Sequence, residues 1–300
     1  MKYTIVITSY NSQKTIGRVL DGIAQLTYLP DEIILVDDSS VDETIIVVQN
    51  RENEFSNFRV IQNQRNMGQS YSRNLGVREA SNAYIIFMDD DDISYSERAK
   101  THLTALSGGA DFSYVSSIKS YGNGYALLAK NDDLSSSTVM PIDLIRYLTN
   151  KTLFKGSQQI YSPSSTLAVK RDSFLKLNGF REDLRRLEDI ELACRALAVG
   201  FLLNWSSEIM VERFNTLGSD KNAYANYVGE IAVLDSVKSF LGKREFFVAR
   251  QMATFRKDYF ERNWWAIVKN SLFLLVIISI SPSKLKSVYK RIRHDRAQRR

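Results

Sequence analysis

The sequence predicts an α/β fold in which helices flank a mostly parallel β-sheet, followed by a helical C-terminal region. Short apolar runs rich in β-branched residues alternate with segments of helical spacing over roughly the first hundred residues. Strongly polar residues follow three of these runs, which is typical of the ligand-binding ends of parallel strands. The 300 residues allow two domains, or one large domain with an appendage.

Strand and helix signals follow one another at the interval of βαβ units. Strands are expected at residues 3–8, 32–37, 58–62 and 84–88, and helices at 16–23, 42–49 and 70–80. Beyond residue 110 the alternation weakens. Strands are expected at 111–115 and 165–169, a helix at 189–198, a hairpin or long loop at 120–138, and irregular structure from 199 to 219.

The composition is that of a globular protein, with 44% hydrophobic and 25% charged residues and only 4 prolines. A single cysteine, Cys194, excludes an intramolecular disulfide, and with only two histidines most zinc-enzyme designs are excluded as well. Any metal is therefore expected to bind to oxygen. Polar residues from Ser9 to Asn11 interrupt the first apolar run, so a signal peptide is not expected and a reducing cytosolic location fits best.

The positive charge is concentrated in the last twenty residues. Eight Lys or Arg and one Asp lie between Ser281 and Arg300, whereas the whole chain has a net charge of +6. The preceding segment, 264–280, reads WWAIVKNSLFLLVIISI. A membrane span takes about 20 apolar residues, and this run is shorter and contains Lys269. We expect a helix that lies in an anionic membrane surface; an ordinary core helix followed by a solvated basic tail is the alternative.

Four consecutive carboxylates, Asp89 to Asp92, follow the strand expected at 84–88. Like charges at this spacing repel one another unless a cation neutralises them. Mg²⁺ takes one or two protein carboxylates and completes its coordination with water and phosphate, which suits an open cluster. A Ca²⁺-binding EF-hand is excluded because the spaced ligands and central glycine are missing. The alternative is a solvated turn that caps the following helix.

Several motifs occur in a fixed order along the chain. They are Thr8–Asn11, Val36–Ser40, Asn66–Gly76, Asp89–Asp92, Val169–Arg171, Gly179-Phe180, and Glu188-Asp189 with Arg195 and Gly200. This ordered set resembles glycosyltransferase family 2, and the resemblance covers roughly residues 3–205. It implies a GT-A fold, a nucleotide-sugar donor and inversion at the anomeric carbon.

The resemblance also implies roles for individual residues. By position, Thr8, Tyr10 and Asp38 hold the nucleobase and ribose, and Asn66, Gly68 and Arg73 shape the same pocket. Asp89, Asp90 and Asp91 occupy the metal-binding DXD slot, with Asp91 as the direct ligand of Mn²⁺ or Mg²⁺, Asp89 as the second candidate ligand and Asp90 near the ribose or phosphate. Asp189, next to Glu188, occupies the position of the general base. The spacer of the DXD slot is itself an aspartate here, so the choice of metal-binding carboxylates stays open.

A domain division and an activity follow from these observations. The expected units are a GT-A domain at 1–218, with a nucleotide-sugar half at 1–115 and an acceptor half at 116–218, and a helical region at 219–300. The hypothesis is an inverting hexosyltransferase of bacterial surface polysaccharide synthesis, with UDP-glucose as the first choice of donor. The acceptor would be a lipid-linked glycan, such as a polyprenyl-diphosphate-linked sugar, at the cytoplasmic face of the inner membrane. Nucleic acid is not an expected partner, because the basic tail lacks stacking aromatics.

Alternative functions use the same residues. A catalytically inactive membrane scaffold could bind a nucleotide sugar without turnover, and a sugar nucleotidyltransferase would react at phosphorus instead of carbon. A nicotinamide dehydrogenase is disfavoured because the first strand is not followed by G-x-G-x-x-G. The simplest structural explanation for Glu188 and Asp189 is that they complement a helix dipole.

Overall fold

The structure is a computed structural model that describes residues 1–120, 126–137, 160–214, 223–263 and 265. Within these residues ten strands form one sheet. The strands are β1 Tyr3–Ser9, β2 Glu32–Asp37, β3 Phe58–Gln62, β4 Tyr84–Asp89, β5 Ile93–Ser94, β6 Phe112–Ser120, β7 Ala126–Ala129, β8 Leu134–Ser135, β9 Leu167–Lys170 and β10 Leu203–Phe214. The helices are α1 Ile16–Ala24, α2 Thr44–Gln49, α3 Gln69–Glu79, α4 Arg98–Ser107, α6 Arg171–Lys176, α7 Glu188–Ala198, α8 Ala223–Ser236 and α9 Lys243–Phe260, with 3₁₀ turns at Glu52–Glu54 and Ser164–Thr166.

The first four strands form a parallel unit in the order β3-β2-β1-β4. Every residue of β1 and β2 is buried, as expected for parallel strands covered on both faces. Alternate side chains enter two separate cores. Val6 packs with residues of α3 and α6 on one face, and Ile5 and Ile7 pack with residues of α1 and α4 on the other. The predicted strands and helices of this half are confirmed to within a residue or two at their ends.

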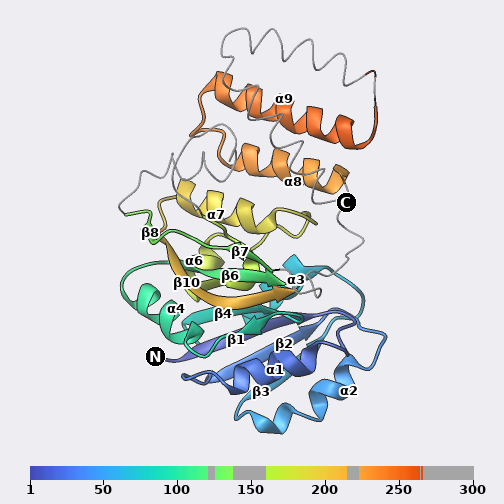
Figure 1. The fold of residues 1–300 in the computed structure, drawn as a ribbon, viewed down its shortest axis with the longest axis vertical. Helices are drawn as coiled ribbons and strands as arrows, with labels where there is room; N and C mark the ends of the chain where they lie inside the picture. Colours follow the sequence, from blue (N-terminus) through green and yellow to red (C-terminus); the bar gives the residue numbers. More distant parts are fainter. Residues whose placement is uncertain (121–125, 138–159, 215–222, 264, 266–300) are drawn as a thin grey trace.

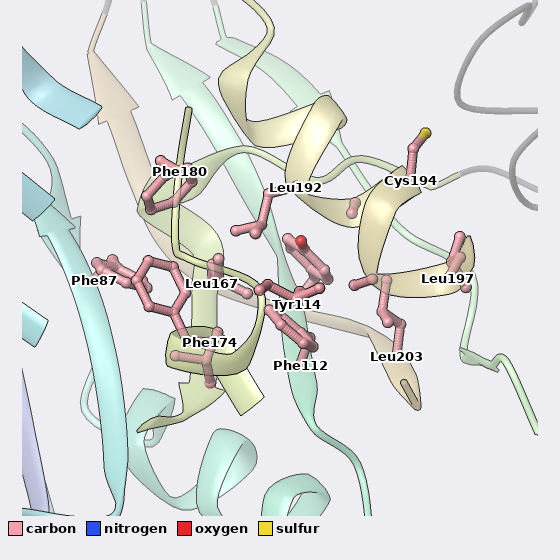
Figure 2. Packing of buried hydrophobic residues seen from close by; sticks show 14 of the residues in the cluster. Phe87, Phe112, Tyr114, Leu167, Phe174, Phe180, Leu192, Cys194, Leu197 and Leu203 are labelled. Carbon is pink, nitrogen blue, oxygen red and sulfur yellow. The ribbon is translucent and has the colours of Figure 1, made fainter. Parts of the chain in front are cut away.

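The other half of the sheet contains antiparallel strands. β9 lies between β4 and β6 and is antiparallel to both, whereas β6 and β10 form a long parallel pair. Three rings, Phe87, Phe174 and Phe180, meet with centroids 5.4–5.5 Å apart, and Tyr114 stacks on Trp205 at 5.7 Å. Figure 2 shows most of this cluster between the sheet and α7, with Cys194 on α7.

β10 is absent from the sequence-based expectation, which assigned irregular structure to 199–219. The prediction is wrong for residues 203–214, which form the longest strand described. Its period-2 pattern is broken near Ser206 and Ser207, and the pairing with β6 shifts register between Trp205 and Ile209. A bulge of this kind interrupts the strict alternation of apolar and polar residues by which a strand is predicted from sequence.

The helices α8 and α9 form an antiparallel hairpin, in which Arg250 pairs with Asp235 and Arg256 pairs with Glu230. In Figure 1 they form successive layers beyond α7, on the side of the sheet away from α1 and α2. Among the helices within the described residues, none combines the length and the hydropathy that a bilayer-spanning helix requires. The hydrophobic segment predicted at 264–280 lies outside the described residues except for Trp265, as does the basic tail at 281–300.

Candidate active site

The carboxyl ends of β1, β2 and β4 meet at one edge of the sheet. Thr8 is the register partner of Asp89 on one side, and Ser9 is the partner of Asp37 on the other. The chain passes from β1 to β2 in one direction and later returns to β4 on the opposite side of β1. Ligands of open α/β sheets bind at such a reversal of strand order. Three of the polar motifs therefore converge as the sequence predicts.

The loops after β1 and β2 fasten to each other at this edge. Asn11, in a left-handed conformation with φ of 52°, donates its backbone N–H to Ser40 Oγ at 2.8 Å and accepts from the Val41 N–H at 2.9 Å. Thr8 is buried, whereas the neighbouring Tyr10 side chain is 48% exposed. This leaves an aromatic ring open to solvent on a backbone that is held in place.

Asp38 holds the loop that enters α3. Its side chain is buried, and its Oδ1 accepts hydrogen bonds from Asn63 Nδ2 at 2.7 Å and from the Met67 N–H at 2.8 Å. Its Oδ2 accepts from the Gly68 N–H at 2.7 Å. Gly68 has a φ of 93°, a conformation that favours glycine, and Asn66 is exposed on the same loop. Asp38 thus positions the loop that carries the other predicted pocket residues.

The four aspartates after β4 have different partners. Asp90 accepts from the Tyr10 N–H at 2.9 Å, and buried Asp92 accepts from the Phe214 N–H at 3.2 Å. Burial raises the pKa of Asp90 to about 7, and the charges of Asp91 and Asp89 add to this effect. The backbone carbonyl of Asp91 accepts from Arg18 Nη2 at 2.7 Å. The run is therefore a partly buried turn held from several sides, and a simple solvated cap does not describe it.

Arg73 connects this acidic turn to α7. The side chain comes from α3, is 1% exposed, and donates from Nη2 to Asp89 Oδ1 at 2.7 Å. Its Nη1 lies 3.4 Å from Glu188 Oε1 at the start of α7. Burial by itself lowers the pKa of Arg73, but Asp89 and Glu188 raise it by more, so the guanidinium stays charged. One buried cation therefore joins two carboxylates that are far apart in the sequence.

The second carboxylate pair begins α7. Asp189 lies beside Glu188, and its Oδ1 accepts from the Ile190 N–H at 2.8 Å. The pKa of Asp189 is raised to about 6, first by burial and then by the charge of Glu188. Arg213 and Arg73 lower it, which limits the shift. A carboxyl with this pKa is mostly ionised at neutral pH and can accept a proton.

The donor set at the end of β4 consists of oxygen atoms. Within the described residues no group of three or more His, Cys, Asp or Glu side chains converges as a metal cage. Mg²⁺ and Mn²⁺ suit carboxylate oxygens, and Mg²⁺ sites commonly use one or two of them together with water and phosphate. Asp89 and Asp91 supply carboxylate oxygens of the chemical type that such an ion binds.

Three arginines near the site could not be predicted as site residues from the sequence. A Cβ on Gly68 would lie 2.4 Å from Arg185 Nη1, so this exposed guanidinium rests directly against the loop entering α3. Arg98 is buried behind the acidic turn and donates to the Phe87 and Ser165 carbonyls at 2.7 Å each. Arg213 lies 3.8 Å from Asp92. All three reach the site through tertiary contacts, which local sequence patterns do not predict.

The model of glycosyl transferase family 2 matches residues 4–176, more than half of the chain. The chain belongs to glycosyl transferase family 2. The match includes the polar ends of β1, β2 and β4 together with Arg73, and it ends with α6. Glu188 and Asp189 lie beyond the matched residues.

Relatives of this family 2 chain align over about two thirds of it. An uncharacterized glycosyltransferase of Haemophilus influenzae is 25% identical over 198 residues, which cover 65% of this chain and 61% of the relative. The O-antigen chain rhamnosyltransferase RfbN of Salmonella typhimurium is 29% identical over 216 residues, which cover 70% of this chain and 66% of the relative. The chain thus spans less than two thirds of the length of either relative.

Solved glycosyltransferases share the fold of this family 2 chain. Staphylococcus aureus TarS 1-349 in complex with UDP-GlcNAc superposes with a TM-score of 0.65 at 19% identity, covering 96% of this chain and 79% of that one. The mannosyltransferase PcManGT of Pyrobaculum calidifontis in complex with GDP-Man and Mn²⁺ gives a TM-score of 0.58 at 15% identity, covering 97% and 79%. The predicted GT-A fold is confirmed.

Proposed function

We propose that this protein transfers a sugar from a nucleotide sugar to an acceptor hydroxyl by one inverting displacement. The observation that carries the proposal is the Arg73 bridge. It holds Asp89, at the donor end of the sheet, and Glu188, beside the proposed base, within one hydrogen-bonded cluster. A transferase needs a group that stabilises the leaving phosphate and a group that takes the acceptor proton at neighbouring positions.

The donor half binds and orients the nucleotide sugar. Tyr10 lies beside the nucleobase, and Asp38 shapes the pocket through its hydrogen bonds to the Met67 and Gly68 amides. Thr8, Asn66 and Asp90 complete the nucleoside end. Asp91 and Asp89 would hold Mn²⁺ or Mg²⁺, which when bound would supply positive charge to stabilise the departing diphosphate.

The acceptor half supplies the base. Asp189 takes the proton of the acceptor hydroxyl as the new glycosidic bond forms on the face opposite the leaving group. Glu188 and Arg73 have opposite effects on this base, because Glu188 raises the pKa of Asp189 and Arg73 lowers it. A single displacement of this kind inverts the anomeric carbon.

We propose a bacterial surface polysaccharide as the product, since a relative of similar sequence is named an O-antigen chain rhamnosyltransferase. A UDP-sugar is the proposed donor, with UDP-glucose as the first choice. Because the structurally similar glycosyltransferases bind different nucleotide sugars, UDP-GlcNAc and GDP-Man, the donor has to be identified with a panel of nucleotide sugars. A lipid-linked glycan is the proposed acceptor. The segment 264–280 and the tail 281–300 would bring the enzyme to an anionic membrane surface at the cytoplasmic face of the inner membrane.

Donor binding and hydrolysis test this proposal. The full chain is assayed with UDP-, GDP- and dTDP-sugars in the presence of Mn²⁺, Mg²⁺ or EDTA, together with Asp91→Ala. The control is Asp21→Ala, which removes an exposed helix carboxylate paired with Arg51. We expect metal-dependent binding and hydrolysis of one nucleotide sugar, lost in Asp91→Ala and kept in the control.

The other outcomes separate the alternatives. Binding of a nucleotide sugar without hydrolysis or transfer to any acceptor would support the inactive scaffold. Release of pyrophosphate from a sugar phosphate and a nucleoside triphosphate would support the nucleotidyltransferase. Absence of binding to every nucleotide sugar would contradict the proposed function.

A further inference from the structure

We propose that the α8–α9 hairpin positions the general base, and that Gly229 of α8 is the positioning residue through which it acts. The inference rests on the proposed role of Asp189. It concerns a part of the chain that the family match does not reach, since that match ends at residue 176.

The backbone of α8 lies directly on the turn before α7. A Cβ on Gly229 would lie 2.3 Å from the carbonyl oxygen of Arg186 and 3.1 Å from the Cβ of Leu187. Real side chains do not approach backbone atoms so closely, so only glycine permits this contact. Asn226, one turn earlier on the same face of α8, accepts a hydrogen bond from Arg186 Nε at 3.2 Å. Both contacts therefore involve Arg186, and the contact at Gly229 also involves Leu187.

The turn that α8 holds is strained. Leu187 has a φ of 64°, and a left-handed conformation is unfavourable for a leucine. Such a conformation persists only where the surrounding structure enforces it. Leu187 is the residue before Glu188, so its backbone angles set the direction in which the first turn of α7 begins. Relaxation of Leu187 would therefore redirect both carboxylates.

The hairpin is anchored to the elements on both of its sides. Val233 and Val237, which follow Gly229 at helical spacing, are buried in the same core as Leu192 of α7. Glu230, next to Gly229, accepts from Arg256 Nη2 of α9 at 2.6 Å and from its Nε at 3.1 Å. α8 is thus fixed to α7 on one side and to α9 on the other.

The loops of the donor site are held mainly by elements other than α8, although Arg185 lies against the Gly68 loop. These loops follow β1, β2 and β4, and Asp38 holds the entry to α3 without a contribution from α8. A change at Gly229 is therefore expected to separate turnover from donor affinity. This separation distinguishes a positioning role from a general loss of structure.

The test compares Gly229→Ala with Gly242→Ala in the full chain. Gly242 is the N-cap residue directly before α9 in the same hairpin and has a φ of −61°, and a Cβ added to it would have no other atom within 4 Å. The readouts are hydrolysis of the nucleotide sugar selected from the donor panel and the Kd of its nucleoside diphosphate. In Gly229→Ala we expect the hydrolysis kcat to fall about 10- to 100-fold, as for a small misplacement of a catalytic group. The Kd should stay within about threefold, and Gly242→Ala should match the wild type in both.

Wild-type kcat in Gly229→Ala would overturn the inference. If Gly229→Ala shows no cooperative thermal unfolding, Asn226→Ala is tested in its place, because it removes only the hydrogen bond to Arg186. A lower kcat at an unchanged Kd is then expected. A wild-type kcat in Asn226→Ala would also overturn the inference. Asp189→Asn separates the two proposals. An inactive Asp189→Asn with an unaffected Gly229→Ala refutes the positioning role alone, whereas wild-type turnover in Asp189→Asn refutes the base and the positioning role together.

Discussion

Asp189 illustrates how burial and neighbouring charges set the chemistry of one carboxylate. Its pKa is raised to about 6, so lowering the pH through this value protonates the proposed base and should reduce the transfer rate. Asp189→Asn should lower the transfer rate about 10²- to 10⁴-fold while leaving donor affinity close to normal. A pH–rate profile and donor titrations check both expectations. Near-wild-type turnover in the variant would assign the base to another residue.

Arg73 is a second case in which one side chain carries a large effect. Arg73→Met leaves Asp89 and Glu188 facing each other without their shared cation, and loss of one partner of a buried pair costs about 3–5 kcal/mol. Urea unfolding measures the change. The control is Arg250→Met, because Arg250 is 43% exposed and its pair with Asp235 should contribute about 0–1 kcal/mol. Equal stability of the two variants would mean that the Arg73 bridge does not stabilise the fold.

At the level of elements, the position of α3 depends on a glycine that lets it approach the sheet. A Cβ on Gly76 would lie 2.4 Å from Val6 Cγ1, so Gly76→Ala should force α3 away from β1 and cost about 1–3 kcal/mol. Gly17 lies in α1 with open space around it. Gly17→Ala should therefore stabilise the protein by about 0.4–1 kcal/mol. Thermal unfolding of Gly76→Ala and Gly17→Ala measures both effects. Equal changes in Tm in the two variants would contradict the packing argument.

Which elements could be predicted depends on how local their signal is. β1, β2 and β4 are continuous apolar runs that end in polar residues, so both their existence and their role at the site could be predicted. β10 could not, because its bulge breaks the alternation. The strained turn at Leu187 could not be predicted either, since a leucine gives no indication of a positive φ.

For the whole molecule, the site is assembled from two halves whose residues could be predicted separately but whose connection could not. The family resemblance implied roles for Asp89 and Asp189, but the pairing of Arg73 with both Asp89 and Glu188 depends on tertiary contacts that bring a side chain of α3 to the end of β4 and the start of α7. Arg98, Arg185 and Arg213 likewise come from separate segments. The sequence therefore predicted the acidic groups of the site better than the cations around them.

Membrane attachment is a property of the entire chain and stays a prediction. Deletion of 281–300 removes eight Lys or Arg and should weaken binding to vesicles that contain anionic lipid, because each cation near such a surface contributes about 1 kcal/mol. Donor hydrolysis should be unaffected. Co-sedimentation with anionic and with zwitterionic vesicles measures the effect. Unchanged binding to anionic vesicles would exclude the tail as the attachment site.

The buried thiol of Cys194 offers a practical route to that question. Cys194 is the one cysteine of the chain, it is fully buried in α7, and burial raises the pKa of its thiol, so reagents that attack thiolates should not reach it. A cysteine introduced at the surface would therefore carry a fluorophore or spin label alone, without prior removal of the native thiol. A probe attached through Ser281→Cys could report its depth in a bilayer on the otherwise unaltered protein.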